Sequence, residues 1–162
     1  MARADLVALA ERLQGICLGK SITVAAAESC TGGLVADAIT DISGSSGYFL
    51  GSIVAYSNEA KTALLGVLPE VLAAHGAVSA QVARAMAIGA RDRLGARLGV
   101  SITGVAGPTG GTADKPIGLT YVGIADADDV DVRRFTWSGD RSANKIASAE
   151  AALELLLERA SR

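Results

Sequence analysis

The feature that most constrains the fold is an alternation of short apolar runs with longer stretches of helical spacing. Residues 22–27 form one apolar run, and residues 34–39 return to helical spacing after a turn of small residues. Short buried strands that alternate with helices are typical of α/β proteins. The sequence therefore predicts a layered α/β/α fold around a mixed, mostly parallel sheet.

The rest of the chain continues this alternation. Helices are predicted near residues 3–18, 34–39, 57–65, 69–75, 81–98 and 142–159. Strands are predicted near residues 22–27, 48–56, 100–105, 117–125 and 130–137. Gly19 and Gly99 are expected to end the first helix and the long Ala-rich helix, because glycine is common just after a helix. The last two strands are joined by an acidic turn, which favours an antiparallel element in the sheet.

Length and charge narrow the class of protein. The 162 residues, half of them hydrophobic, are expected to form a single domain over residues 1–162, without a linker or repeat. The net charge of -2 offers no basic field for a phosphate backbone, so no nucleic-acid partner is expected. No apolar run approaches the roughly 18–20 residues of a membrane span, and the N-terminus lacks a signal-peptide core. We therefore expect a cytoplasmic protein without a membrane partner.

Cysteine and histidine are scarce. Cys17 and Cys30 provide neither a disulfide framework nor the spacing of metal ligands, and His75 is the single histidine. The sequence therefore predicts no metal site. His75 lies at a predicted helix end, where capping or solvent exposure is its ordinary role. Histidine, which is the usual general base of a serine hydrolase, is therefore not expected to fill that role here.

Three loops follow predicted strands, at residues 28–33, 56–61 and 103–111. In open α/β sheets, ligands bind outside the carboxyl ends of the strands. We therefore expect these loops to converge on one pocket.

The first of these loops contains a candidate nucleophile. Ser29 stands beside Gly32 and Gly33 at the start of a predicted helix, where backbone N–H groups can hold an oxyanion or a phosphate. A capped helix with glycines for close packing would have the same pattern. Cys30 is a rival nucleophile, since a thiol at a helix start can be activated, or it is a small buried residue. Thr31 could cap the helix, donate a hydrogen bond to the site or fill space.

A serine hydroxyl needs a base before it can attack an amide, and Lys61 is the best candidate. It lies in the first turn of a helix that begins at Ser57 or Asn58, where the positive end of the dipole disfavours a protonated amine. Moving a lysine pKa from about 10.4 to the neutral range requires about 4 kcal/mol. A helix terminus contributes only about 0.3–1 kcal/mol, so burial must supply the rest. Without burial beside Ser29, Lys61 would be an ordinary surface lysine.

The third loop and the last helix supply further candidates. Residues 103–111 begin at Thr103 and are rich in glycine, but they match neither the phosphate loop of nucleoside triphosphatases nor the dinucleotide fingerprint. They form either a substrate-embracing loop or a structural turn; their glycines are Gly104, Gly107, Gly110 and Gly111. Arg141, just before the last helix, is a candidate phosphate clamp or a surface arginine.

Together these segments resemble the CinA C-terminal domain family, whose members include bacterial nicotinamide-nucleotide amidases. The resemblance covers roughly residues 20–160, and the motif segments show no departure from the family pattern. The matching stretches are residues 27–33 (AESCTGG), 44–49 (GSSGYF), 54–61 (VAYSNEAK), 75–79 (HGAVS), 103–111 (TGVAGPTGG), 115–118 (KPIG) and 139–141 (GDR).

The resemblance implies a serine/lysine amidohydrolase that converts nicotinamide mononucleotide to nicotinic acid mononucleotide and ammonia. It assigns Ser29 as nucleophile, Lys61 as base, and Tyr56 and Thr31 as supporting catalytic residues. It implies no metal and no organic cofactor, and a homo-oligomer. Longer members carry an extra N-terminal domain with a separate nucleotide-hydrolysing activity, which is not inferred here. The predicted substrate-binding residues are Cys30, Gly32, Gly33, Thr103, Gly104, Gly107, Gly110, Gly111 and Arg141.

Three other hypotheses compete with the amidase. The domain could bind a pyridine nucleotide without catalysis, or it could be an interaction protein in DNA uptake or damage responses. It could also be a cysteine hydrolase that uses Cys30. Ammonia release from the mononucleotide, and its dependence on Ser29, Lys61 and Cys30, separates these hypotheses. The number of subunits, the range of carboxamides accepted and the side chains that bind the phosphate stay open at this point.

Overall fold

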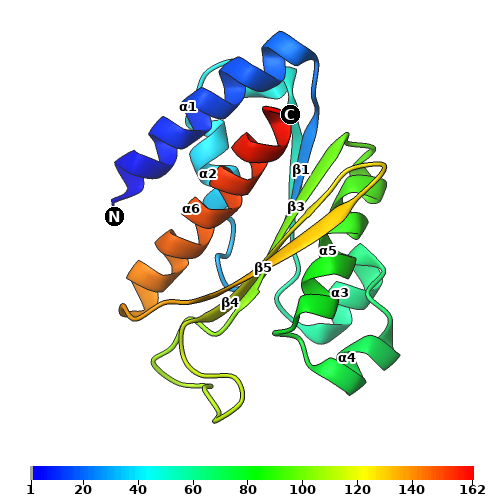
Figure 1. Cartoon of the computed structure of the whole chain (residues 1–162), viewed down its shortest axis with the longest axis vertical. Helices are drawn as coiled ribbons and strands as arrows, with labels where there is room; N and C mark the ends of the chain where they lie inside the picture. The colour runs from blue at the N-terminus through cyan, green and yellow to red at the C-terminus, as the bar shows by residue number, and fades with distance from the viewer. Residues whose placement is uncertain (1) are drawn as a thin grey trace.

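The structure is a computed structural model that describes residues 2–162, and helices alternate with strands in its first part, up to β2 (Figure 1). The elements are α1 (Arg3–Lys20), β1 (Val24–Glu28), α2 (Leu34–Thr40), a 3-10 turn (Ser45–Gly47), β2 (Phe49–Val54), α3 (Asn58–Leu65), α4 (Pro69–His75), α5 (Ala80–Leu94), β3 (Leu98–Gly104), β4 (Leu119–Ala125), β5 (Val130–Thr136) and α6 (Arg141–Ala160).

The five strands form one mixed sheet in the order β2-β1-β3-β4-β5. Strands β2, β1 and β3 are parallel, whereas β4 is antiparallel to both β3 and β5. Every residue of β1 is buried, as expected for a central strand covered on both faces. The predicted mixed sheet is confirmed, including its antiparallel element at the end of the chain.

Helices cover both faces of the sheet (Figure 1). Helices α1, α2 and α6 contact one another and enclose the larger apolar core, to which β1 contributes Val24 and Ala26. Helix α5 crosses the other face, with α3 and α4 against it, and β1 contributes Ala25 and Ala27 to that core. Alternate residues of β1 thus face opposite layers, which is the period of a strand. The α/β/α layering is therefore confirmed.

The predicted end of the long Ala-rich helix was wrong. Helix α5 ends at Leu94, and Gly95 caps it in the left-handed conformation with a φ of 68°. Gly99 instead lies inside β3, where an added Cβ would meet the backbone of α5 at Ala87 and Arg91. Glycine at position 99 therefore permits close contact between helix and strand, whereas the residue that ends the helix is Gly95.

The carboxyl ends of three parallel strands meet at one edge of the sheet. Glu28, the last residue of β1, is in register with Val54 of β2 and with Ile102 of β3. The loops that follow these strands consequently leave the sheet side by side. No helix within residues 2–162 is long and apolar enough to cross a membrane.

Candidate active site

The turn after β1 is built on a buried carboxylate. Glu28 has no exposed surface, and its Oε1 accepts hydrogen bonds from Thr31 Oγ1 (2.8 Å) and the Val35 backbone N–H (3.0 Å). Its Oε2 accepts from the Ala36 N–H (3.2 Å) and from Ser52 Oγ (2.9 Å). The carboxylate thus ties the turn at residues 29–33 to the start of α2 and to β2, and it fixes the next residue, Ser29, near the N-terminus of that helix.

Lys61 approaches Ser29 from the first turn of α3. The helix begins after Ser57, whose side chain accepts a hydrogen bond from the Ala60 N–H. The Lys61 side chain is 1% exposed, and its Nζ lies 3.0 Å from Ser29 Oγ. Two backbone oxygens complete its surroundings, those of Ala55 at 2.9 Å and Tyr56 at 3.2 Å. The buried amine that the sequence required beside Ser29 is therefore present.

Burial lowers the pKa of Lys61 below its ordinary value, because the charged ammonium loses its hydration. A neutral amine has two N–H donors and one lone pair. In that neutral form, the carbonyls of Ala55 and Tyr56 can accept the two N–H groups, and the lone pair can accept the proton of the Ser29 hydroxyl. After Lys61 accepts a proton, the same three oxygens satisfy its three donors. The surroundings therefore suit both protonation states of a general base.

Cys30 lies beside Ser29 but in an environment that favours the thiol. Its side chain is buried, and burial raises its pKa to about 11. Its own backbone N–H and the positive charges of Lys145 and Lys61 act in the opposite direction without reversing this effect. Since the thiolate is the reactive form, Cys30 is a weak nucleophile at neutral pH.

The turn also offers backbone donors to an oxyanion. The Gly32 N–H already donates to the Ser29 carbonyl. Among the described residues, the N–H groups of Cys30, Thr31 and Gly33 donate to no backbone carbonyl and to no side-chain oxygen. These N–H groups therefore have no acceptor in the fold, and of the three residues only Cys30 lines the cavity beside Ser29.

Arg141 crosses the mouth of the site. Its guanidinium donates to the Gly107 carbonyl (2.8 Å) and to the Tyr56 hydroxyl (3.3 Å), so it joins the loops after β2 and β3 to the start of α6. Below it lies a cavity of about 310 Å3, here named the Ser29 cavity. The cavity is lined by Ser29, Cys30, Tyr56, Lys61, Ala77, Val78, Thr103, Gly104, Val105, Ala106, Gly107, Thr109 and Arg141.

Most of the predicted site residues line the Ser29 cavity. The others lie near it but do not line it. The Thr31 side chain points away from the cavity, because its hydroxyl donates to Glu28. Thr103 lines the cavity but directs its hydroxyl to the Ala77 carbonyl at 2.8 Å. The predicted residues that do not line the cavity are Thr31, Gly32, Gly33, Gly110 and Gly111.

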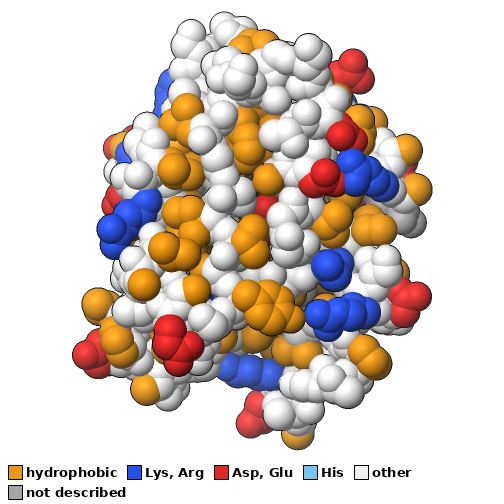
Figure 2. Space-filling model, turned by 180° about the vertical axis from the view of Figure 1, so that it is seen from behind, with side chains coloured by type: hydrophobic (Ala, Val, Ile, Leu, Met, Phe, Trp, Pro, Cys, Tyr) orange, Lys and Arg blue, Asp and Glu red, His pale blue; other side chains and the backbone are white. Residues whose placement is uncertain are grey.

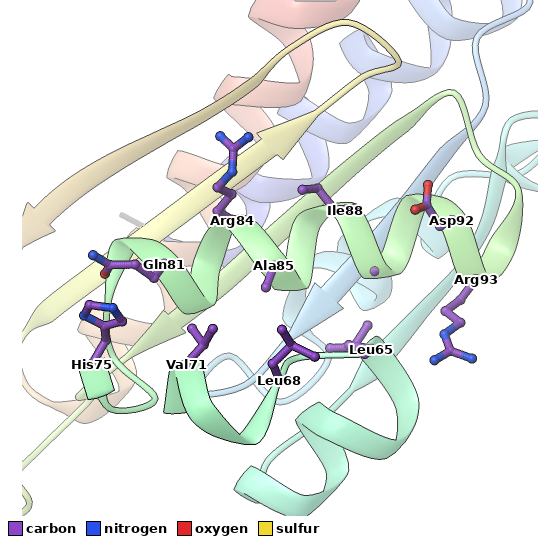
Figure 3. Close-up of a pocket in the computed structure, with 12 residues that line it drawn as sticks. Leu65, Leu68, Val71, His75, Gln81, Arg84, Ala85, Ile88, Asp92 and Arg93 are labelled. Carbon is purple, nitrogen blue, oxygen red and sulfur yellow. The ribbon is translucent and has the colours of Figure 1, made fainter. Parts of the chain in front are cut away.

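A larger and mostly apolar hollow, of about 570 Å3, lies elsewhere, between α5 and the α3–α4 segment (Figure 3). Leu65, Leu68 and Val71 face Ala85 and Ile88 across it, and His75 stands at one end. It contains none of the predicted catalytic residues. Within residues 2–162, no group of three or more His, Cys, Asp or Glu side chains could hold a metal ion.

Several residues that shape the site were missed by the sequence interpretation. Glu28 had a detectable signal, since a carboxylate at the end of an apolar strand is unusual and needs hydrogen-bond partners. Asn144 had none: its side chain donates to the Ala106 carbonyl and accepts from the Gly139 N–H, which fixes α6 to the loop over the cavity. The carbonyls that orient Lys61 are also invisible in a sequence, because every residue has one.

Comparison with known proteins identifies the family of the chain. The family profile described as the CinA C-terminal domain matches residues 6–160. The chain belongs to this family. A CinA-like protein of Geobacter sp. (strain M21) is 50% identical over 146 residues, which cover 90% of this chain and 35% of that protein. A CinA-like protein of Chlorobaculum tepidum is 52% identical over 158 residues, covering 94% of this chain and 37% of that protein. The chain thus spans about a third of the length of these curated relatives.

Solved structures of the CinA family share the whole fold. The crystal structure of a competence/damage inducible protein from Agrobacterium tumefaciens has a TM-score of 0.94 at 39% identity, and the match covers 98% of this chain and 96% of that one. A CinA superfamily protein from Escherichia coli has a TM-score of 0.92 at 28% identity, with 98% and 93% covered. The CinA fold therefore accounts for nearly all of the chain, since each match covers 98% of it.

Proposed function

We propose that this CinA-family domain is an amidohydrolase that removes ammonia from the carboxamide of nicotinamide mononucleotide. The observation that carries the proposal is the 3.0 Å contact between the buried amine of Lys61 and the hydroxyl of Ser29. A serine paired with a desolvated lysine is a nucleophile paired with its base, which is the requirement for acyl transfer. The choice of substrate follows from the resemblance to nicotinamide-nucleotide amidases, and the comparisons support the family alone.

The first half of the reaction transfers the acyl group to the enzyme. Lys61 takes the proton of the Ser29 hydroxyl as its oxygen attacks the carboxamide carbon. The oxyanion would be held by backbone N–H groups of the turn that lack an acceptor, of which Cys30 is the one whose residue lines the Ser29 cavity. The carbon–nitrogen bond then breaks, and the protonated Lys61 gives its proton to the departing nitrogen. Ammonia leaves, and an ester on Ser29 remains.

The second half restores the enzyme. Lys61 takes a proton from a water molecule as the water oxygen attacks the ester carbon. The bond to the Ser29 oxygen breaks, and Lys61 returns the proton to that oxygen. The product is nicotinic acid mononucleotide, whose new carboxyl group ionises. Every proton passes through Lys61, and the steps assign no role to a metal or an organic cofactor.

The proposal also covers the surroundings of the reacting atoms. Tyr56 and Arg141 stand at the mouth of the Ser29 cavity, where they are placed to contact the ring, the ribose or the phosphate. Thr31 acts indirectly, through its hydrogen bond to Glu28. We further propose that the domain acts in the cytoplasm, without a nucleic-acid partner and as a homo-oligomer, whose subunit number light scattering would measure.

Ammonia release from nicotinamide mononucleotide tests the proposal directly. Ser29→Ala removes the nucleophile, and Lys61→Met removes the base while it keeps the volume of a buried chain. Since a general base contributes about 10²–10⁴-fold, we expect Lys61→Met to lose at least about 10²-fold and Ser29→Ala to lose nearly all activity. Wild-type protein that binds the nucleotide but releases no ammonia would refute the amidase and favour a non-catalytic binder. Binding to DNA that weakens steeply with salt would favour the interaction-protein alternative.

A further inference from the structure

A second cavity adjoins the Ser29 cavity through Arg141. It has a volume of about 390 Å3 and lies against the first turn of α6 and the start of α2. Arg141 lines both cavities, so the two share a wall. We name it the Lys145 cavity; it is lined by Arg3, Leu34, Arg141, Ser142, Lys145 and Ile146. Figure 2, turned by 180° from Figure 1, shows Lys and Arg side chains gathered toward the lower right, the side on which α6 begins.

Two of the three cations in this cavity have no carboxylate partner. Arg3 forms ion pairs with Asp37 and Asp41, so its charge is compensated. Arg141 donates only to the neutral oxygens of a carbonyl and a phenol. Lys145 takes part in no hydrogen bond and no ion pair within residues 2–162. Arg141 and Lys145 are one helical turn apart, so their positive charges lie on the same face of α6.

Lys145 also lies close to the catalytic turn. Its Nζ is 3.8 Å from the position that a Cβ would occupy at Gly32. The influence of the Lys145 charge on the pKa of Cys30 agrees with this short distance. Burial is the main cause of the raised pKa of that thiol. The positive charge of Lys145 acts in the opposite direction, and it lowers the pKa more than the charge of Lys61 does. The ammonium group therefore stands beside the turn that carries Ser29, while it remains outside the Ser29 cavity.

We propose that Lys145, together with Arg141, binds the phosphate of the substrate in the Lys145 cavity. This inference rests on the proposed function and extends it, because it names the site of the anionic group. In a mononucleotide the ribose separates the carboxamide from the phosphate, so the two groups cannot occupy the same place. The Ser29 cavity, at about 310 Å3, is near the lower end of the roughly 300–1,000 Å3 of small-molecule sites. With the carboxamide at Ser29, the phosphate therefore extends past Arg141.

The chemistry of the two side chains suits a phosphate monoester. A guanidinium offers paired N–H donors to phosphate oxygens, and an ammonium acts as a compact point charge. Both contacts form equally in the ground state and the transition state, because the phosphate does not react. Their loss should consequently raise KM and leave kcat nearly unchanged.

Steady-state kinetics of Lys145→Ala on two substrates test the inference. For nicotinamide mononucleotide we expect KM to rise about tenfold or more, with kcat within about twofold of wild type. For the nucleoside without the phosphate, nicotinamide riboside, we expect no change in kcat/KM. Lys145→Arg should recover most of the affinity, because it restores the charge. Arg12→Ala, which removes an exposed helical cation that lines neither cavity, is the matched control and should behave as wild type.

A binding measurement separates this inference from the amidase proposal. Ribose 5-phosphate carries the anionic group without a carboxamide, so its binding does not depend on catalysis. Calorimetry should detect its binding to wild-type protein and at least a tenfold loss in Lys145→Ala, even if no ammonia is ever released. An unchanged KM and unchanged ribose 5-phosphate affinity in Lys145→Ala would overturn the inference while the amidase stands. An equal loss of kcat on both substrates would also overturn it, since it would place Lys145 at the oxyanion.

Discussion

The amine of Lys61 lies within hydrogen-bonding distance of the Ser29 hydroxyl and of two neighbouring backbone carbonyls. Nζ lies 3.0 Å from Ser29 Oγ, although the two residues are 32 positions apart in the chain. The amine is oriented by Ala55 and Tyr56, the residues that lead from β2 into α3. One segment of the chain therefore supplies both the proposed base and the carbonyls that hydrogen-bond to it.

The first prediction concerns the pH dependence of activity. Lys61 works as a base only when neutral, so kcat/KM should fall on the acid side as pH drops through the pKa of Lys61. Burial lowers that pKa, so the acid limb should lie below the roughly 10.4 of a free lysine. Rates of ammonia release measured across pH at low substrate would locate the limb. A profile that rises only near the ordinary lysine value would contradict a desolvated base.

The second prediction concerns stability. A base whose pKa is lowered by folding binds fewer protons in the folded than in the unfolded state, so stability rises with pH between the lowered pKa and about 10.4. Below that window the cost of burying the charged amine is present in full, and above it the cost is gone. Lys61→Met never bears this cost. The melting temperature of Lys61→Met minus that of wild type should therefore be largest at acid pH, and this difference should decline as pH rises.

That comparison needs only thermal unfolding of the two proteins in a series of buffers. It does not depend on the identity of the substrate, so it tests the burial of the amine independently of the amidase. A difference between the two proteins that stays constant from acid to alkaline pH would show that Lys61 is hydrated in the folded state.

The third prediction concerns Cys30. Burial raises the pKa of its thiol to about 11, so the thiolate is scarce at neutral pH. Cys30→Ala should keep at least about half of the wild-type kcat, because it removes no reacting group. Cys30→Ser should likewise remain active, and alkylation of the native thiol by iodoacetamide should be slow at pH 7. Loss of turnover in both variants, with the fold intact by circular dichroism, would support the cysteine hydrolase instead.

The fourth prediction concerns the carboxylate beneath the site. Glu28→Ala leaves four donors without their acceptor: the hydroxyls of Thr31 and Ser52 and the N–H groups of Val35 and Ala36. Since each buried donor without a partner costs about 1–3 kcal/mol, we expect the free energy of unfolding to fall by about 3 kcal/mol or more. Urea denaturation would measure the loss.

Glu28→Gln is the matched comparison for that measurement. Its amide oxygen can still accept from Thr31 and Val35, and the Ser52 hydroxyl can rotate to accept from the amide nitrogen. Only the Ala36 N–H then faces another donor, so the loss should be clearly smaller than for Glu28→Ala. Equal losses in the two variants would mean that charge, rather than the number of hydrogen bonds, holds the turn together.

The local pattern of the sequence determined most of the secondary structure. Apolar runs and helical spacing predicted every strand and helix, because side-chain period depends on a few neighbouring residues. The end of α5 was misplaced since both Gly95 and Gly99 follow the helix, and the sequence does not say which adopts the left-handed conformation. Ser29 and Lys61 could be named as candidates because strand ends and helix starts are themselves local features.

Tertiary structure alone decided what those residues can do. The register of β1 with β2 brings Ser29 to Lys61, and only the packing of α3 removes water from the amine. The buried carboxylate of Glu28 turned Thr31 inward, whereas the sequence left open whether that hydroxyl caps the helix, donates to the site or fills space. Lys145, more than a hundred residues from the catalytic turn, lies beside it because α6 crosses the sheet there. Distances and burial of this kind depend on contacts between segments far apart in the chain, and no local pattern records them.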